Sequence, residues 1–252
     1  MMNEHDSMTP VIVAIDGPAG SGKSSVSREA AKRLGYALLD TGAAYRALAW
    51  FAREEGIDLD GEDAAIEREV TRVLPVFIRE YRISLAPDER WVRVADTDVT
   101  DAIRETAVSN AVSAVARIPE VRATLTGLFR DTLLGANRPG VIAEGRDITT
   151  VVAPDAPVRV LLTASEEARI RRRAAERVGD DQAAVARSVA QRDAKDSRVA
   201  AFLQAADGVT VLDSSDLDFD ETVTALIRLI EQSAEHTAPA DTPAPTDSED
   251  DA

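Results

Sequence analysis

Residues Gly17–Ser24 read GPAGSGKS, a P-loop motif, and this motif constrains the fold more than any other part of the chain. The β-branched run Val11–Ile15 directly precedes it and predicts a buried strand. The pattern over Ser24–Leu34 predicts a helix, with Gly35 as its stop signal. A strand, a glycine-rich turn and a helix in this order are the setting that a P-loop requires, which argues against a chance glycine-rich turn.

The P-loop predicts a site for the phosphates of ATP. Glycines let backbone N–H groups converge on a phosphate without clashes from Cβ atoms, and the positive end of the following helix adds to the attraction. Lys23 is expected to contact the β- and γ-phosphates, and the Ser24 hydroxyl to hold Mg²⁺. The predicted ATP-binding residues are Gly17, Pro18, Ala19, Gly20, Ser21, Gly22, Lys23, Ser24 and Ser25.

The composition argues against several other kinds of site. The chain has no cysteine, which rules out disulfides and thiolate metal sites and suggests a cytoplasmic location. Both histidines, His5 and His236, lie in the two polar ends of the chain, so we expect no histidine base and no zinc site. The formal net charge of −16 is opposite to what a general nucleic-acid binder needs. The apolar runs are far shorter than the roughly 18 residues of a membrane span, and no signal-peptide pattern opens the chain, so we expect no membrane partner.

The rest of the chain predicts one α/β domain over residues 10–233. Residues 1–9 are polar, and residues 234–252 are rich in Pro, Ala, Thr and acids, so both ends are expected to be disordered. Between them, short apolar runs alternate with helical patterns, which predicts a five-stranded parallel sheet flanked by helices. The runs are Val11–Ile15, Ala37–Leu39, Val141–Ala143, Val158–Leu162 and Val209–Leu212.

An insert at about residues 65–105 interrupts this alternation. Val76–Leu85 and Trp91–Val94 read as two strands, joined by a turn at Pro87-Asp88-Glu89, with no helix between them. This pattern predicts a small antiparallel element that projects from the main sheet. The sequence leaves open whether the insert is a packing or dimer element or a clamp on a second substrate.

Charged residues follow the second and third predicted strands. The first segment, Asp40–Arg46, reads DTGAAYR, and the second, Glu144–Asp147, reads EGRD. Ligand sites in parallel sheets lie beyond the carboxyl ends of the strands, and arginine can bind a phosphate through two parallel hydrogen bonds. Alternatively, Tyr45 packs in the core and the arginines pair with nearby acids. The predicted substrate-side residues here are Asp40, Thr41, Tyr45, Arg46, Glu144, Arg146 and Asp147.

Three segments together resemble the bacterial cytidylate kinase family. They are DTGAAYR, NAVSAVARIPEVR and EGRDITTVVAPDAPV, and the resemblance extends from about Val11 to Ile230. It implies a P-loop kinase that transfers phosphate from ATP to CMP or dCMP, with a monophosphate-binding insert and a helical lid at about residues 165–200. It also implies a monomer.

The resemblance assigns roles to particular residues. Ser113, Arg122 and Asp147 match positions that bind cytosine, and this suits the base, because Asp147 can accept a hydrogen bond from its N4 amino group. Uracil has a carbonyl there, which a carboxylate would repel. Arg46 and Arg146 match positions that hold the monophosphate, and Tyr45 matches one that packs near the nucleotide. Arg192 and Asp196 match positions that contact the sugar.

Arginines in the predicted lid complete the expected catalytic set. Arg169, Arg172 and Arg173 have helical spacing and can share a face, from which one or more can reach the transferring phosphate when the lid closes. The alternative is a solvated face paired with neighbouring glutamates. The predicted catalytic residues are Lys23, Arg146, Arg172 and Arg192.

Two positions depart from the family pattern. Thr149 stands where the family often has glycine, and Asp196-Ser197-Arg198 is one residue shorter than the usual Asp-Ser-x-Arg. The second departure leaves open whether Arg198 or Lys195 contacts a phosphate. Two other functions stay in view: a kinase of a small metabolite, which would not need the cytosine-binding residues, and a regulatory module that binds ATP without turnover.

Overall fold

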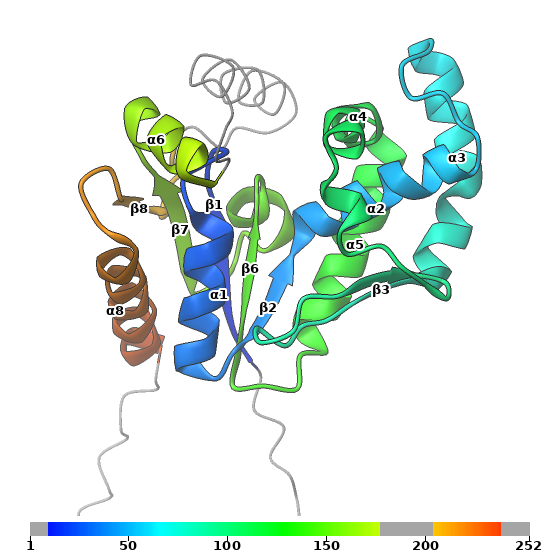
Figure 1. The fold of residues 1–252 in the computed structure, drawn as a ribbon. Coiled ribbons are helices and arrows are strands. Elements are labelled where there is room, and N and C mark those ends of the chain that lie inside the picture. The colour runs from blue at the N-terminus through cyan, green and yellow to red at the C-terminus, as the bar shows by residue number, and fades with distance from the viewer. Residues whose placement is uncertain (1–9, 177–203, 238–252) are drawn as a thin grey trace, which may run out of the picture.

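Five parallel strands form the main sheet, in the order β2-β6-β1-β7-β8 (Figure 1). The computed structural model describes residues 10–176 and 204–237. All five strands expected from the sequence are confirmed, and the P-loop strand lies at the centre of the sheet. The strands are β1 (Val11–Asp16), β2 (Ala37–Asp40), β6 (Gly140–Gly145), β7 (Val158–Thr163) and β8 (Thr210–Asp213).

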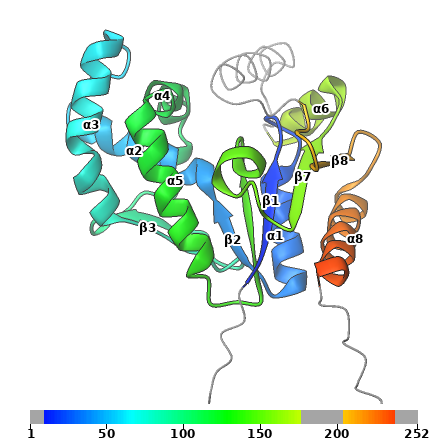
Figure 2. The same cartoon turned by 180° about the vertical axis from the view of Figure 1, so that it is seen from behind.

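Helices cover both faces of this sheet, so its central strands are buried on both sides. On one face, Val13 and Ile15 of β1 pack with α1 and α8. Ala14 points to the other face and joins a larger core with α2 and α5 (Figures 1 and 2). The described helices are α1 (Lys23–Leu34), α2 (Thr41–Glu54), α3 (Asp63–Glu80), α4 (Thr106–Ala116), α5 (Pro119–Leu134), α6 (Glu166–Glu176), α8 (Phe219–Thr237) and the short turns η1 (Ala102–Arg104) and η2 (Ile148–Val152).

Several predicted boundaries can be compared with these elements. Gly35 ends α1 in the left-handed conformation, as the stop signal predicts. Helix α6 provides the helical start of the expected lid. Helix α8 continues to Thr237, beyond the domain boundary expected at residue 233. Residues 234–237, which were expected to be disordered, belong to this helix. The other residues expected to be disordered, 1–9 and 238–252, and the rest of the expected lid lie outside the described residues. No described helix has both the length and the apolar character needed to cross a membrane.

The insert contains the predicted antiparallel sheet, but its first strand is much shorter than expected. The strands are β3 (Tyr81–Ile83), β4 (Val92–Val94) and β5 (Thr97–Asp98). Val76–Glu80 belongs instead to the end of α3, so the prediction of a strand from Val76 was wrong. Phe77 is 0% exposed and Val76 is 41% exposed, because the helix directs only one face into the core. Packing therefore overrides the β propensity of this segment.

The turn of the insert is attached to the main sheet and to α1. The Leu38 amide of the edge strand β2 donates to the carbonyl of Leu85 over 2.9 Å. Arg28 of α1 donates to the carbonyls of Pro87 and Glu89, over 2.7 and 3.0 Å. These bonds hold the predicted Pro87–Glu89 turn, so the insert is joined to the core at a defined place.

Close packing of the P-loop against β7 makes Gly17 a test of the fold. A Cβ atom on Gly17 would lie 2.2 Å from the carbonyl oxygen of Leu162. We expect Gly17→Ala to lower the free energy of unfolding by about 1–3 kcal/mol, because the backbone must move to relieve this overlap. Urea unfolding followed by circular dichroism measures the change.

Gly127 in α5 is the matched control, because a Cβ atom there would meet nothing within 4 Å. Gly127→Ala should raise the free energy of unfolding by roughly 0.5–1 kcal/mol, since alanine favours a helix interior. Equal effects at the two positions would show that close packing does not set the requirement at Gly17.

Candidate active site

The P-loop joins β1 to α1 in the way the motif predicts. Gly20 and Gly22 have φ angles of 78° and 88°, a region that side chains other than glycine's rarely adopt. Helix α1 begins at Lys23, and no side chain in the described structure caps its N-terminus. The backbone donors of a helix start and its positive dipole end therefore face the loop, an arrangement that suits a phosphate group.

Two carboxylates lie near this helix start, the buried Glu144 and the partly buried Asp40. Asp40 and Glu144 are paired in the ladder between β2 and β6, at the carboxyl ends of both strands. The Ser24 hydroxyl donates to Glu144 Oε1 over 2.6 Å, and Lys23 Nζ lies 3.9 Å from Glu144 Oε2. The strand register thus brings the predicted phosphate-binding and metal-binding residues next to two acids.

The two carboxylates differ in their electrostatics. Burial raises the pKa of Glu144, and the negative charge of Asp40 raises it further. Burial also opposes ionisation of Asp40, but the charge of Arg46 and the amide of Ala43 hold its pKa below the ordinary value. Arg46 Nη2 lies 2.8 Å from Asp40 Oδ2. Arg46 therefore pairs with a nearby acid, as one of the two sequence interpretations expected.

The EGRD segment connects the P-loop to a second cluster. Arg146 Nη1 donates to the carbonyl of Gly17 over 2.6 Å, which places this arginine at the start of the P-loop. The next residue, Asp147, forms an ion pair with Arg122 of α5. Burial and the negative charge of Asp147 raise the pKa of Tyr45 to about 12. The fold thus brings Tyr45, Arg122 and Asp147 together from three separate segments.

The structure places some of the other predicted substrate residues, and the rest lie outside the described part of the chain. Thr41 donates from Oγ1 to the carbonyl of Glu144 over 2.9 Å and so ties α2 to β6. Ser113 lies on α4, and within the described ranges no hydrogen bond joins it to Arg122 or Asp147. Arg192 and Asp196, with Lys195 and Arg198, lie outside the described residues.

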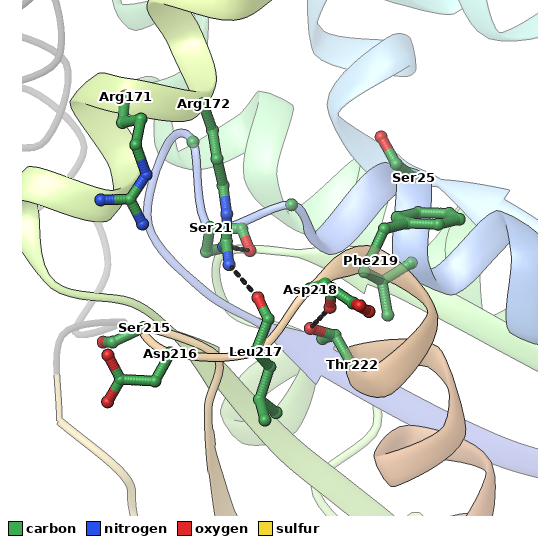
Figure 3. A pocket seen from close by; sticks show the side chains of 13 residues that line it. Ser21, Ser25, Arg171, Arg172, Ser215, Asp216, Leu217, Asp218, Phe219 and Thr222 are labelled. Atoms are coloured by element: carbon green, nitrogen blue, oxygen red, sulfur yellow. Dashed lines mark hydrogen bonds between the residues drawn. The ribbon is translucent and has the colours of Figure 1, made fainter.

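A cavity of about 640 Å³ opens beside the P-loop. It is bounded by the P-loop and α1 on one side, α6 above, and the segment between β8 and α8 (Figure 3). Asp218 and Glu221 cap α8 at this edge, each accepting from the other's backbone amide over 2.8 and 2.9 Å. The lining residues are Gly20, Ser21, Gly22, Ser25, Val26, Arg171, Arg172, Ser215, Asp216, Leu217, Asp218, Phe219 and Thr222.

Arg172 joins the elements around this cavity. It donates to the carbonyl of Ser21 over 3.1 Å, to Oγ and the carbonyl of Ser214 over 3.0 and 2.5 Å, and to the carbonyl of Leu217 over 3.2 Å. Figure 3 shows its side chain reaching from α6 toward Ser21 and Leu217. Arg169 also reaches the loop, donating to the carbonyl of Ala19 over 3.2 Å. The side chain of Arg173 lies outside the described residues.

Sequence reasoning missed two residues of this region. Arg104 of η1 is half-buried, and burial, with the positive charges of Arg90 and Arg46, lowers its pKa. Asp16, the last residue of β1, is 3% exposed and accepts hydrogen bonds from residues 148 and 149. A charged residue at the end of an apolar strand, directly before a P-loop, was the available signal for Asp16.

Comparison with known proteins places the chain in a family. The family described as cytidylate kinase matches residues 13–232. The chain belongs to the cytidylate kinase family. This match spans the P-loop, the insert and the EGRD segment, and it confirms the resemblance seen in the sequence.

Individual members of the cytidylate kinase family cover most of the chain. A cytidylate kinase of Cutibacterium acnes is 46% identical over 226 residues, which are 89% of this chain and 97% of that protein. One from Streptomyces avermitilis is 41% identical and covers 88% of this chain and 93% of its own length. One from Nocardia farcinica is 42% identical, with coverage of 89% and 95%.

The contacts of Arg172 predict a large effect from a conservative change. Arg172→Lys should lower the free energy of unfolding by about 1–3 kcal/mol, because a lysine ammonium cannot form all the hydrogen bonds that the guanidinium makes to two loops. Arg171 is the matched control, since it is an exposed neighbour on the same helix. Arg171→Lys should change the free energy by no more than about 0.5 kcal/mol. Chemical denaturation of both variants makes the comparison, and equal effects would contradict the clamping role of Arg172.

Proposed function

We propose that the protein transfers the γ-phosphoryl group of ATP to the phosphate of CMP or dCMP and releases ADP with CDP or dCDP. Family membership supports this activity and favours it over a kinase of a small metabolite. The observation that carries it is the cluster of Tyr45, Arg122 and Asp147, which offers a carboxylate, a guanidinium and an aromatic ring. Residue 146, next to this cluster in the chain, bonds to the P-loop. A module that only binds ATP has no use for such a cluster.

On the ATP side, we assign the phosphates to the P-loop and the helix start of α1. Lys23 would neutralise charge on the β- and γ-phosphates. The cavity next to Gly20–Gly22 is large enough for the nucleoside, and Phe219, which is partly exposed there, offers an apolar surface to the base. The loop and the cavity are adjacent, so one ATP molecule can span both.

Magnesium would bind with the ATP phosphates near Ser24. The donors available there are the Ser24 hydroxyl and the carboxylates of Glu144 and Asp40, which are hard oxygen ligands of the kind Mg²⁺ prefers. No group of three or more acidic, histidine or cysteine residues that could hold a metal occurs in the described part of the chain. The phosphates and water would therefore supply most of the ligands, and the ion would neutralise phosphate charge.

On the acceptor side, we assign the monophosphate to Arg46 and Arg146 and the base to Arg122 and Asp147. Asp147 would accept from the cytosine N4 amino group, and Arg122 would donate to its N3 and O2 atoms. Arg146 donates to the carbonyl of Gly17, the first P-loop residue, and this proximity supports a role for Arg146 near the phosphates of both substrates. The attacking phosphate oxygen is anionic, and the reaction therefore needs alignment and charge neutralisation rather than a general base.

The remaining assignments rest on the resemblance and, for Arg172 and the location, on the sequence pattern and composition. Ser113 is proposed to assist in binding the base, and Arg192 and Asp196 to contact the sugar. Arg172 is proposed to lie near the transferring phosphate once the lid closes and excludes water. We also propose that the protein acts as a monomer in the cytoplasm.

The first test is acceptor specificity. Coupled ADP release should be fast with ATP, Mg²⁺ and either CMP or dCMP, and slow with UMP, AMP or GMP, because only cytosine presents an amino group beside two acceptors. Turnover with UMP at the same rate would contradict the assignment of Asp147. Absence of turnover with every monophosphate would contradict the proposed activity.

The role of Asp147 can be tested separately. Asp147→Ala should lower kcat/KM for CMP by about tenfold to a hundredfold, because a buried polar contact to the base is lost. The ratio of kcat/KM for CMP to kcat/KM for UMP should therefore fall. Asp155→Ala is the control, since this exposed acid lies in the loop before β7. An unchanged CMP to UMP ratio in Asp147→Ala would show that Asp147 does not recognise the base.

A further inference from the structure

Asp16 is a buried carboxylate to which the proposed mechanism gives no task. Its side chain accepts the amide of Ile148 over 2.8 Å, the amide of Thr149 over 2.9 Å, and the hydroxyl of Thr149 over 2.5 Å. All three donors belong to two consecutive residues of a different segment. Burial raises the pKa of Asp16, because a charged carboxylate is unfavourable in this environment. The three hydrogen bonds offset part of the cost of burying it.

The two donor residues directly follow Arg146 and Asp147. Ile148 opens the single π-helical turn η2, in which the amides of Val152 and Ala153 bond five residues back. Such turns are rare and gather at functional sites. A backbone of this unusual geometry needs support from outside, and the Asp16 carboxylate supplies two of its hydrogen bonds.

The backbone that precedes Arg146 and Asp147 is held by the hydrogen bonds between strands β1 and β6. Gly145 lies opposite Asp16 in the register of β1 and β6. A Cβ atom on Gly145 would lie 2.4 Å from Thr41 Oγ1, so the backbone is closely packed here as well. Arg146 and Asp147 are therefore fixed on both sides, before them by the ladder and after them by Asp16.

We propose that Asp16 and Thr149 are positioning residues for the acceptor substrate, an inference that rests on the proposed function. The Asp16 carboxylate holds the backbone that carries Arg146 and Asp147, and the Thr149 hydroxyl holds the carboxylate. Because Asp16 also precedes the P-loop, one buried group ties the acceptor loop to the end of the strand from which the ATP loop begins. Thr149 thus supplies a hydrogen bond that a glycine at this position cannot make.

The decisive variant is Thr149→Val, which keeps the shape of the side chain and removes its hydroxyl donor. We expect KM for CMP to rise by about fivefold or more, because Asp147 loses its fixed position. The ratio of kcat/KM for CMP to kcat/KM for UMP should fall for the same reason. KM for ATP should stay within about twofold, since P-loop contacts are unaltered. Thr149→Ser should restore the wild-type values, because it returns the donor. Thr150→Val is the matched control, because Thr150 is exposed on the same turn.

Two results would overturn the proposal. One is an unchanged KM for CMP together with an unchanged CMP to UMP ratio in Thr149→Val. The other is a loss of stability and kcat with no shift in KM for CMP, which a purely structural role predicts. Wild-type protein that fails to phosphorylate CMP would instead reject the proposed function itself.

A measurement on the unaltered protein tests the proposal even if a variant does not fold. Amide hydrogen exchange followed by NMR should show Ile148 and Thr149 protected to the same degree as the central strand β1, because both amides bond to a buried acceptor. Rapid exchange of the two amides under conditions where β1 stays protected would contradict a clamp at Asp16.

Discussion

The parallel register between β6 and its two neighbours is the constraint on which the site depends. It sets Glu144 opposite Asp40 and Gly145 opposite Asp16, so that three chain segments end at one edge of the sheet. The P-loop, helix α2 and the EGRD segment all start from that edge. A shift of one residue in either ladder would turn the side chains of the shifted strand to the other face of the sheet, and the residues of the site would no longer meet.

The acids at this edge, one buried and two partly buried, each have a partner. Asp40 has Arg46, Asp147 has Arg122, and Glu144 has the hydroxyl of Ser24 and the ammonium of Lys23. Removing a charge from water without a partner costs several kcal/mol, and each of these cations or donors offsets part of that cost. In the proposed reaction, phosphates would compete with these acids for the same cations, which links substrate binding to a rearrangement of existing contacts.

Features that depend on neighbouring residues were predicted more accurately than features that depend on contacts between distant parts of the chain. The P-loop and the five strands were predicted correctly because their signals are local patterns of apolar residues and glycines. The strand expected from Val76 was wrong, since the burial of Phe77 on a helix face outweighed local β propensity. Tyr45 and Asp147 were predicted from their positions after two strands, and Arg122 was named from the resemblance alone; the structure brings the three together. Asp16 was missed because its partners follow more than a hundred residues later.

The sequence by itself determined the fold class, the phosphate-binding loop and the family, because each rests on the identity and spacing of neighbouring residues. Only the tertiary structure decided which charges pair. Asp147 meets Arg122, Glu144 meets Ser24 and Asp16 meets Thr149 through contacts between segments whose relative position depends on strand order, register and helix packing. Spacing along a chain carries no information on such pairs, because their energies depend on distance and burial in the folded protein.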